Sequence, residues 1–163
     1  MSREPILNEQ GTARTQALAA RRRLLDGPSV TERVVEVAGI ETSLLEGGEG
    51  RPLVLLHGQG ASAVAWAPII PALRANHRVV VPDLPGLGES QVHHGELDAT
   101  RVTEWLNGLV AETCDEPPTI VGLSLGGTIA IHFAVDHGDK CRSLVLVDSS
   151  SLGPFRPSLG GLT

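Results

Sequence analysis

The sequence has 163 residues, with 13 Lys and Arg against 19 Asp and Glu, so its formal net charge is −6. This length suits one domain with a hydrophobic core, and an apolar share of 41% excludes a disordered chain. A mildly acidic chain lacks the cations that neutralise phosphates, which argues against nucleic-acid binding. No apolar run reaches the roughly 20 residues that span a bilayer, so we expect neither a membrane span nor a signal peptide.

Two cysteines, Cys114 and Cys141, stand apart from each other and lack the spacing of a metal site or a redox pair. We expect them to be free thiols of a protein in the reducing cytoplasm. No other motif in the sequence suggests a metal.

The first 30 residues are more polar than the rest and end in a turn signal. An Ala- and Arg-rich pattern over residues 12–25 predicts an amphipathic helix within this N-terminal extension. We interpret the basic run Arg21-Arg22-Arg23 as a solvated helix face.

From residue 31 onward, short apolar runs alternate with helical patterns. Residues 34–37 and 40–45 predict two strands joined by a turn. Four later runs are continuously apolar, as parallel strands buried on both faces should be. These runs cover residues 53–56, 79–81, 119–121 and 144–147. Helical patterns lie between them, at residues 66–74, 102–110 and 125–135. The alternation predicts an α/β fold with a mostly parallel sheet and flanking helices, whose chemistry lies at the carboxyl ends of the strands.

The loop after the third buried strand carries a G-x-S-x-G motif formed by Gly122, Ser124 and Gly126. An apolar strand precedes it and an apolar helix follows, which is the context of a nucleophile turn. The two glycines leave room where strand and helix converge, and the helix N-terminus supplies partial positive charge beside a developing oxyanion. The motif predicts Ser124 as a nucleophile. The alternative is a tight turn in which Ser124 caps the helix.

Three loops of this chain together resemble those of the α/β-hydrolase superfamily in order and spacing. They read His57-Gly58-Gln59-Gly60, then D-x-P-G-x-G-x-S over 83–90, then G-x-S-x-G-G over 122–127. The resemblance covers residues 33–149. It implies that Ser124 is the nucleophile and that the backbone N–H groups of Gln59 and Leu125 form the oxyanion hole.

The same resemblance implies loop-shaping roles for His57, Gly58 and Asp83, and no proton transfer by His57. Asp83 is expected to bond nearby backbone N–H groups. A serine in the turn argues against the haloalkane dehalogenase and epoxide hydrolase branches, whose nucleophile is Asp. The expected reaction transfers an acyl group to water from an ester, a thioester or a similar bond of a small-molecule substrate, with no cofactor.

A serine nucleophile needs a base and an orienting acid, and the base is missing. His132 lies eight residues after Ser124, about 12 Å along a helix, whereas a general base must come within roughly 3 Å. His137 is farther still. Asp148, after the strand 144–147, is the candidate acid; the alternative is an ordinary loop residue at a strand end.

The family fold has eight strands with a lid after the sixth, whereas this sequence predicts six strands. We therefore expect an extension at 1–30, the N-terminal part of a hydrolase core at 31–149, and the start of a lid or a tail at 150–163. On this interpretation the chain is the N-terminal part of a longer enzyme and its own activity is in doubt. The strand 144–147 would be an exposed apolar edge, open to self-association.

Two other functions stay open. Gly58, Gly60 and Ala63 after a strand, with Asp83 about 20 residues on, fit the loose dinucleotide-binding pattern G-x-G-x-x-G/A. That interpretation leaves the Ser124 motif unexplained. The missing histidine instead favours a non-catalytic fragment or an interaction module that uses the exposed edge.

Overall fold

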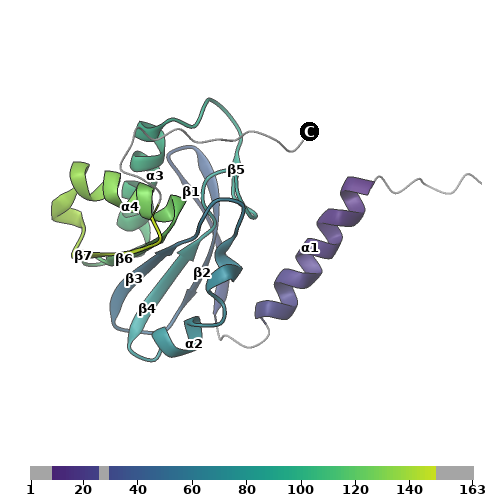
Figure 1. Cartoon of the computed structure of the whole chain (residues 1–163), viewed down its shortest axis with the longest axis horizontal. Coiled ribbons are helices and arrows are strands. Elements are labelled where there is room, and N and C mark those ends of the chain that lie inside the picture. Colours follow the sequence, from purple (N-terminus) through teal and green to yellow (C-terminus); the bar gives the residue numbers. More distant parts are fainter. Residues whose placement is uncertain (1–8, 26–29, 150–163) are drawn as a thin grey trace, which may run out of the picture.

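A seven-stranded mixed sheet forms the centre of the computed structural model, which describes residues 9–25 and 30–149 (Figure 1). The strands are β1 (Thr31–Val37), β2 (Ile40–Gly47), β3 (Arg51–Leu56), β4 (His77–Pro82), β5 (Gln91–Val92), β6 (Thr119–Leu123) and β7 (Ser143–Val147). Six of them lie in the order β1-β2-β4-β3-β6-β7, and β5 pairs with β2. The strands β4, β3, β6 and β7 are parallel, and β2 runs antiparallel to its neighbours. The predicted α/β class is confirmed.

The described helices are α1 (Glu9–Leu25), α2 (Ile70–Leu73), α3 (Ala99–Thr113) and α4 (Leu125–Asp136), with the 3-10 turns η1 (Ala63–Trp66) and η2 (Gly138–Lys140). The helices α3 and α4 lie on one face, whereas η1 and α2 lie on the other (Figure 1). The C-terminal end of helix α1 lies near the sheet, and the rest of the helix points away from it (Figure 1).

The strand β3 shows why the buried runs are apolar without interruption. Successive side chains of a strand point to opposite faces of the sheet. Val54 and Leu56 join the core beneath α3 and α4, while Leu53 and Leu55 join the core beneath η1 and α2. Each position of the strand therefore faces one of the two cores and requires an aliphatic residue.

The helix α3 is fixed to the sheet by an apolar stripe and by one buried hydrogen bond. Its start is capped by Asp98, whose Oδ1 accepts the backbone N–H of Arg101 at 2.8 Å. Trp105 and Leu109 are fully buried on the inner side. The indole Nε1 of Trp105 donates to Oγ1 of Thr42 on β2 at 2.8 Å. The helix predicted over 102–110 is confirmed.

The observed elements differ from the predicted ones at two places. The helix expected over 66–74 is split into η1 and α2, because Pro68 and Pro71 lack the N–H groups that would continue one helix. The strand β5 was not predicted, since a pair of residues carries too short a pattern. Val135, at the end of the predicted and observed helix α4, is exposed.

In the part of the chain that the structure describes, no helix is both long and apolar enough to cross a bilayer. The expected lid or tail at 150–163 lies outside the described residues. The division of the chain at residues 30 and 149 stays a prediction.

Candidate active site

Ser124 occupies the turn between β6 and α4, with backbone angles φ 49° and ψ −110°. This region is sparsely populated for residues with a side chain, so the turn is strained. The backbone holds it in place: the Ser124 N–H donates to the carbonyl of Val147 at 3.0 Å, and its carbonyl accepts the N–H groups of Gly127 and Thr128. Ser124 occupies the N-cap position of α4, as the alternative interpretation predicted, but its side chain makes no capping hydrogen bond to the helix. The hydroxyl is therefore not used to cap α4.

The glycines around Ser124 allow β6 and α4 to meet. A Cβ atom on Gly122 would lie 2.5 Å from the Cα of Gly127, and one on Gly126 would lie 2.3 Å from the carbonyl oxygen of Leu56. Both approaches are shorter than van der Waals contact and involve backbone, which cannot move aside cheaply. Any side chain at either position would push the helix away from the strand.

The loop that begins at His57 borders the serine turn. A Cβ atom on Gly58 would lie 3.4 Å from the Cβ of Ser124. The parallel register pairs Leu56 of β3 with Gly122 of β6, so the two loops leave the same edge of the sheet. Gln59 and Leu125, the expected oxyanion donors, follow Gly58 and Ser124 directly. Leu125 is the first residue of α4, where backbone N–H groups have no partner within the helix.

His57 is fully buried and bonded through both ring nitrogens. Its Nε2 accepts the backbone N–H of Leu84 at 3.0 Å, and its Nδ1 lies 2.8 Å from the carbonyl oxygen of Gly58. A neutral ring with the proton on Nδ1 satisfies both contacts. Burial disfavours the charged form and lowers the pKa of His57. An imidazole in this state joins two loops and has no nitrogen left to activate Ser124.

Asp83 lies at the centre of a buried hydrogen-bond network at the carboxyl end of β4. Its carboxylate accepts the backbone N–H of Ala63 at 2.6 Å and that of Glu89 at 3.0 Å. The hydroxyl of Ser90 donates to the Asp83 carbonyl at 2.8 Å and accepts the N–H of Ser43 at 3.0 Å. A carboxylate buried in this way is not presented to a ribose hydroxyl, which counts against the dinucleotide-binding interpretation.

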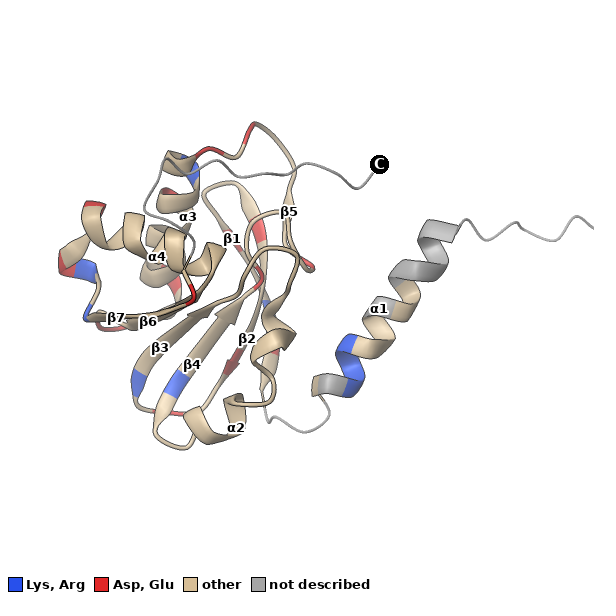
Figure 2. Ribbon diagram, viewed as in Figure 1, with Lys and Arg blue, Asp and Glu red and all other residues tan. Residues whose placement is uncertain are grey.

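Arg21 is the functional candidate that the sequence did not reveal. Its guanidinium Nη1 lies 3.0 Å from Oδ2 of Asp83, and its Nε lies 2.7 Å from Oε1 of Glu32. The interpretation of the basic run as a solvated face is wrong for Arg21, which is 8% exposed, although Arg22 and Arg23 are exposed. These cations lie on the turn of α1 nearest the sheet (Figure 2). Arg21 and Asp83 are too far apart in sequence for a local pattern to pair them.

The candidate acid and the two histidines that follow Ser124 are less well placed around the serine than the glycines of the turn. Asp148 follows β7 as an exposed residue with φ 44°, one position after the carbonyl that holds the Ser124 backbone. His132 lies two turns along α4 from Ser124. His137 ends that helix, with its ring 5.3 Å from the ring of Phe133. Neither histidine is at hydrogen-bond distance from a nucleophile at the start of the helix.

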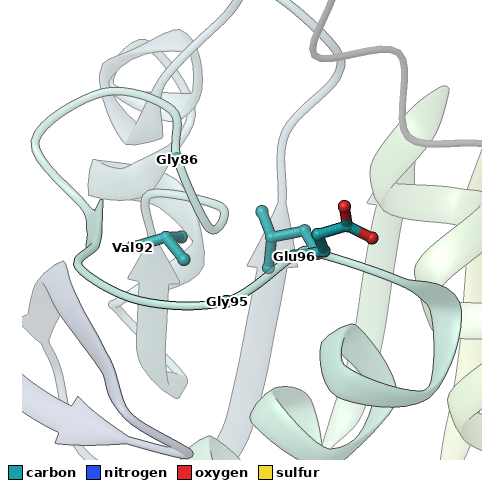
Figure 3. A pocket seen from close by; sticks show the side chains of 5 residues that line it. Gly86, Val92, Gly95 and Glu96 are labelled. Atoms are coloured by element: carbon teal, nitrogen blue, oxygen red, sulfur yellow. The ribbon is translucent and has the colours of Figure 1, made fainter.

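A shallow cavity of about 460 Å³ lies beside the loop after β4 (Figure 3). Its described lining consists of Gly86, Val92, Gly95, Glu96 and Leu97. Ser124 is not among these residues, so we assign the cavity no part in the site. Nor do the described residues contain a cluster of three His, Cys, Asp or Glu side chains that could hold a metal ion.

Comparison with known proteins identifies the family. Residues 51–159, more than half of the chain, match the model of the alpha/beta hydrolase fold. The chain is 35% identical over 125 residues to 2-hydroxy-6-oxo-6-(2'-aminophenyl)hexa-2,4-dienoic acid hydrolase of Metapseudomonas resinovorans, covering 74% of this chain and 43% of that protein. It is 41% identical over 103 residues to pimeloyl-[acyl-carrier protein] methyl ester esterase of Aeromonas hydrophila, covering 63% and 39%.

A solved structure supports the same assignment. The crystal structure of the lip1 protein from Acinetobacter baumannii superposes with a TM-score of 0.77 at 32% identity, over 86% of this chain and 48% of that one. The chain belongs to the α/β-hydrolase family. It spans less than half the length of the curated relatives named above. A soluble epoxide hydrolase of Corynebacterium is a further relative, 32% identical over 119 residues and covering 73% of this chain and 42% of that protein. The relatives are thus hydrolases of several kinds, and membership of the family leaves the reaction open.

Proposed function

We propose that this chain carries the nucleophile and the oxyanion hole of a serine hydrolase that transfers an acyl group from a small ester, thioester or similar compound to water. The backbone of Ser124 carries the proposal: φ is 49°, and the hydroxyl is not used to cap α4. A relative that hydrolyses a methyl ester supports an ester as the substrate. A serine at the turn, where epoxide hydrolases of the family use Asp, supports acyl transfer over epoxide opening.

In the proposed reaction the oxygen of Ser124 attacks the carbonyl carbon of the substrate and loses its proton to a base. The carbonyl oxygen becomes an oxyanion, which accepts hydrogen bonds from the N–H groups of Leu125 and Gln59. Collapse expels the alcohol or thiol, which takes up the proton, and leaves an acyl-serine. Water then repeats the attack and releases the acid. Asp148 would orient the base. The described residues do not place a histidine where the base must act, so the base must come from elsewhere.

A non-catalytic interaction module is the second candidate, and one observation favours it. Both histidines that follow Ser124 lie along or at the end of α4, away from the nucleophile. Without a base, the serine would stay a weak nucleophile. In that case the exposed edge at β7 would be the functional feature of the chain.

Covalent labelling separates the two candidates. The purified chain is treated with a fluorophosphonate probe, and intact mass is measured beside Ser124→Ala and a matched control, Ser143→Ala, an exposed serine at the start of β7 and at the other end of the strands. Activity predicts one adduct on the wild type and on Ser143→Ala, and none on Ser124→Ala. A folded wild-type chain that gains no adduct would overturn the hydrolase proposal for this chain and leave the interaction module.

A further inference from the structure

We propose that Arg21 is a positioning residue of the candidate active site. Through Asp83, it holds the loop that presents the Gln59 N–H to the oxyanion. This inference rests on the proposed function, because the proposed function assigns an oxyanion donor to this loop. It adds the N-terminal helix α1 to the parts on which the site depends.

The first step is the burial of an ion pair between α1 and the sheet. Arg21 is 8% exposed and Asp83 is fully buried, with 3.0 Å between Nη1 and Oδ2. The same guanidinium also reaches Glu32 of β1, at 2.7 Å from Nε. A planar guanidinium can bond two carboxylates at once, whereas an ammonium is a compact point charge. The contact therefore fixes both the position and the orientation of the arginine head group.

The second step connects Asp83 to the oxyanion loop, which runs from residue 57 to residue 63. The end of this loop is held by the Ala63 N–H, which donates to Oδ1 of Asp83 at 2.6 Å. Its beginning is held by His57, which accepts the N–H of Leu84 at 3.0 Å. Both ends thus depend on the two residues that follow β4, and Gln59 lies between them.

The third step is electrostatic. A buried carboxylate without a cation is unfavourable, because the interior does not replace its hydration. Loss of Arg21 would leave Asp83 with backbone N–H partners alone. The carboxylate would then draw in water or turn outward, and either change would release the Ala63 N–H. Because Gln59 lies only four residues before Ala63, the oxyanion donor would lose its fixed place.

Hydrogen exchange with mass spectrometry tests this chain of contacts without requiring activity. The variants are Arg21→Ala, Arg21→Lys and the matched control Arg22→Ala, an exposed neighbour on the same helix. Arg21→Ala is expected to raise exchange in peptides covering 57–66 and 83–90 at least about tenfold, with little change in peptides of α3. Arg21→Lys should restore part of the protection, and Arg22→Ala should match the wild type. Unchanged exchange in Arg21→Ala, or an equal rise everywhere, would overturn the positioning role.

The labelling reaction supplies the kinetic readout. Arg21→Ala should lower the maximal rate of phosphonylation of Ser124 by about tenfold and leave the probe concentration at half-maximal rate unchanged, because an oxyanion donor acts mainly in the transition state. A rise in that concentration at an unchanged maximal rate would assign Arg21 to probe binding and overturn the proposal. If the wild type does not label at all, the proposed function fails, while the exchange measurement still decides the role of Arg21.

Discussion

In the strand order, β3 and β4 and the loops that follow them lie on one side of the Ser124 turn, and β7 lies on the other. On the first side, His57 and Asp83 are fully buried and each has several hydrogen-bond partners. On the second side, three consecutive aliphatic residues of β7 are exposed. These are Val145 at 46%, Leu146 at 45% and Val147 at 41%. On the first side, buried polar groups have hydrogen-bond partners, whereas on the second side aliphatic side chains stay exposed.

The difference indicates which part of the site this chain builds by itself. The nucleophile turn and the proposed oxyanion loop rest on contacts among described residues. On the β7 side, the carbonyl of Val147 holds the Ser124 backbone, and Asp148 follows as an exposed residue at the strand end. A site of this kind can place a hydroxyl and two N–H donors, but the described residues give it no partner for proton transfer. Four sets of variants test this difference between the two sides.

The largest effect is expected at the crowded turn itself. Gly126→Ala places a methyl group 2.3 Å from a backbone oxygen of β3, and we expect it to lower the free energy of unfolding by about 3 kcal/mol. The control is Gly138→Ala, where a Cβ atom meets nothing within 4 Å and the change should stay within about 0.5 kcal/mol. Urea denaturation measures both. Equal stability of the two variants would mean that the turn is not packed as described.

The second effect is a pH dependence at the buried side. Burial holds the pKa of His57 below its ordinary value of 6.5, so below pH 6.5 the unfolded chain binds a proton that the folded chain does not. The contribution of His57 to stability is therefore constant above pH 6.5 and is lost on acidification, by up to about 1.4 kcal/mol per pH unit. Urea denaturation of His57→Gln between pH 5 and pH 8 should show a shallower slope than the wild type. The same slope in both would assign the acid sensitivity to other groups; His94→Gln, in an exposed loop, is the control.

The third effect has the opposite sign. Ser124→Gly relieves the strained φ of 49°, and we expect a gain of about 1 kcal/mol after the added freedom of the unfolded chain is counted. Ser62→Gly is the matched control, since Ser62 has an extended φ of −149° and should lose about 0.5 kcal/mol. Thermal and urea denaturation of the pair measure the difference. A loss of stability in Ser124→Gly would show that the turn stores no strain.

The smallest change in stability is expected for a substitution in β7, where we expect a change in self-association instead. The strand reads Ser-Leu-Val-Leu-Val without a charge, whereas β1, at the other edge of the sheet, carries Glu32, Arg33 and Glu36. Uncharged edges pair with other chains. We expect concentration-dependent association of the wild type in sedimentation velocity, reduced by Val145→Lys with less than about 0.5 kcal/mol change in stability. Val34→Lys on β1 should leave association unchanged. A wild type that stays monomeric would contradict self-association through β7.

The order of the elements and the position of the turn follow from local sequence patterns. Continuous aliphatic runs predict strands buried on both faces, and the 102–110 stripe predicts one helix, because these patterns depend on local periodicity. The Gly122-x-Ser124-x-Gly126 motif located the strained residue for the same reason. The prediction from sequence patterns was wrong over 66–74, where two prolines interrupt a helical pattern. It also missed β5, which is too short to show a strand pattern.

The surroundings of the turn depend on contacts between residues that are far apart in the sequence. The pairing of Arg21 with Asp83 joins a helix outside the sheet to the end of a central strand, and no local pattern connects residues so far apart in sequence. The neutral state of His57 depends on its complete burial and on an N–H donated from the next loop. The contrast between the buried loops after β3 and β4 and the exposed strand β7 likewise follows from the strand order. Sequence periodicity specifies which way a side chain points within its own element, whereas the fold specifies which other element it meets.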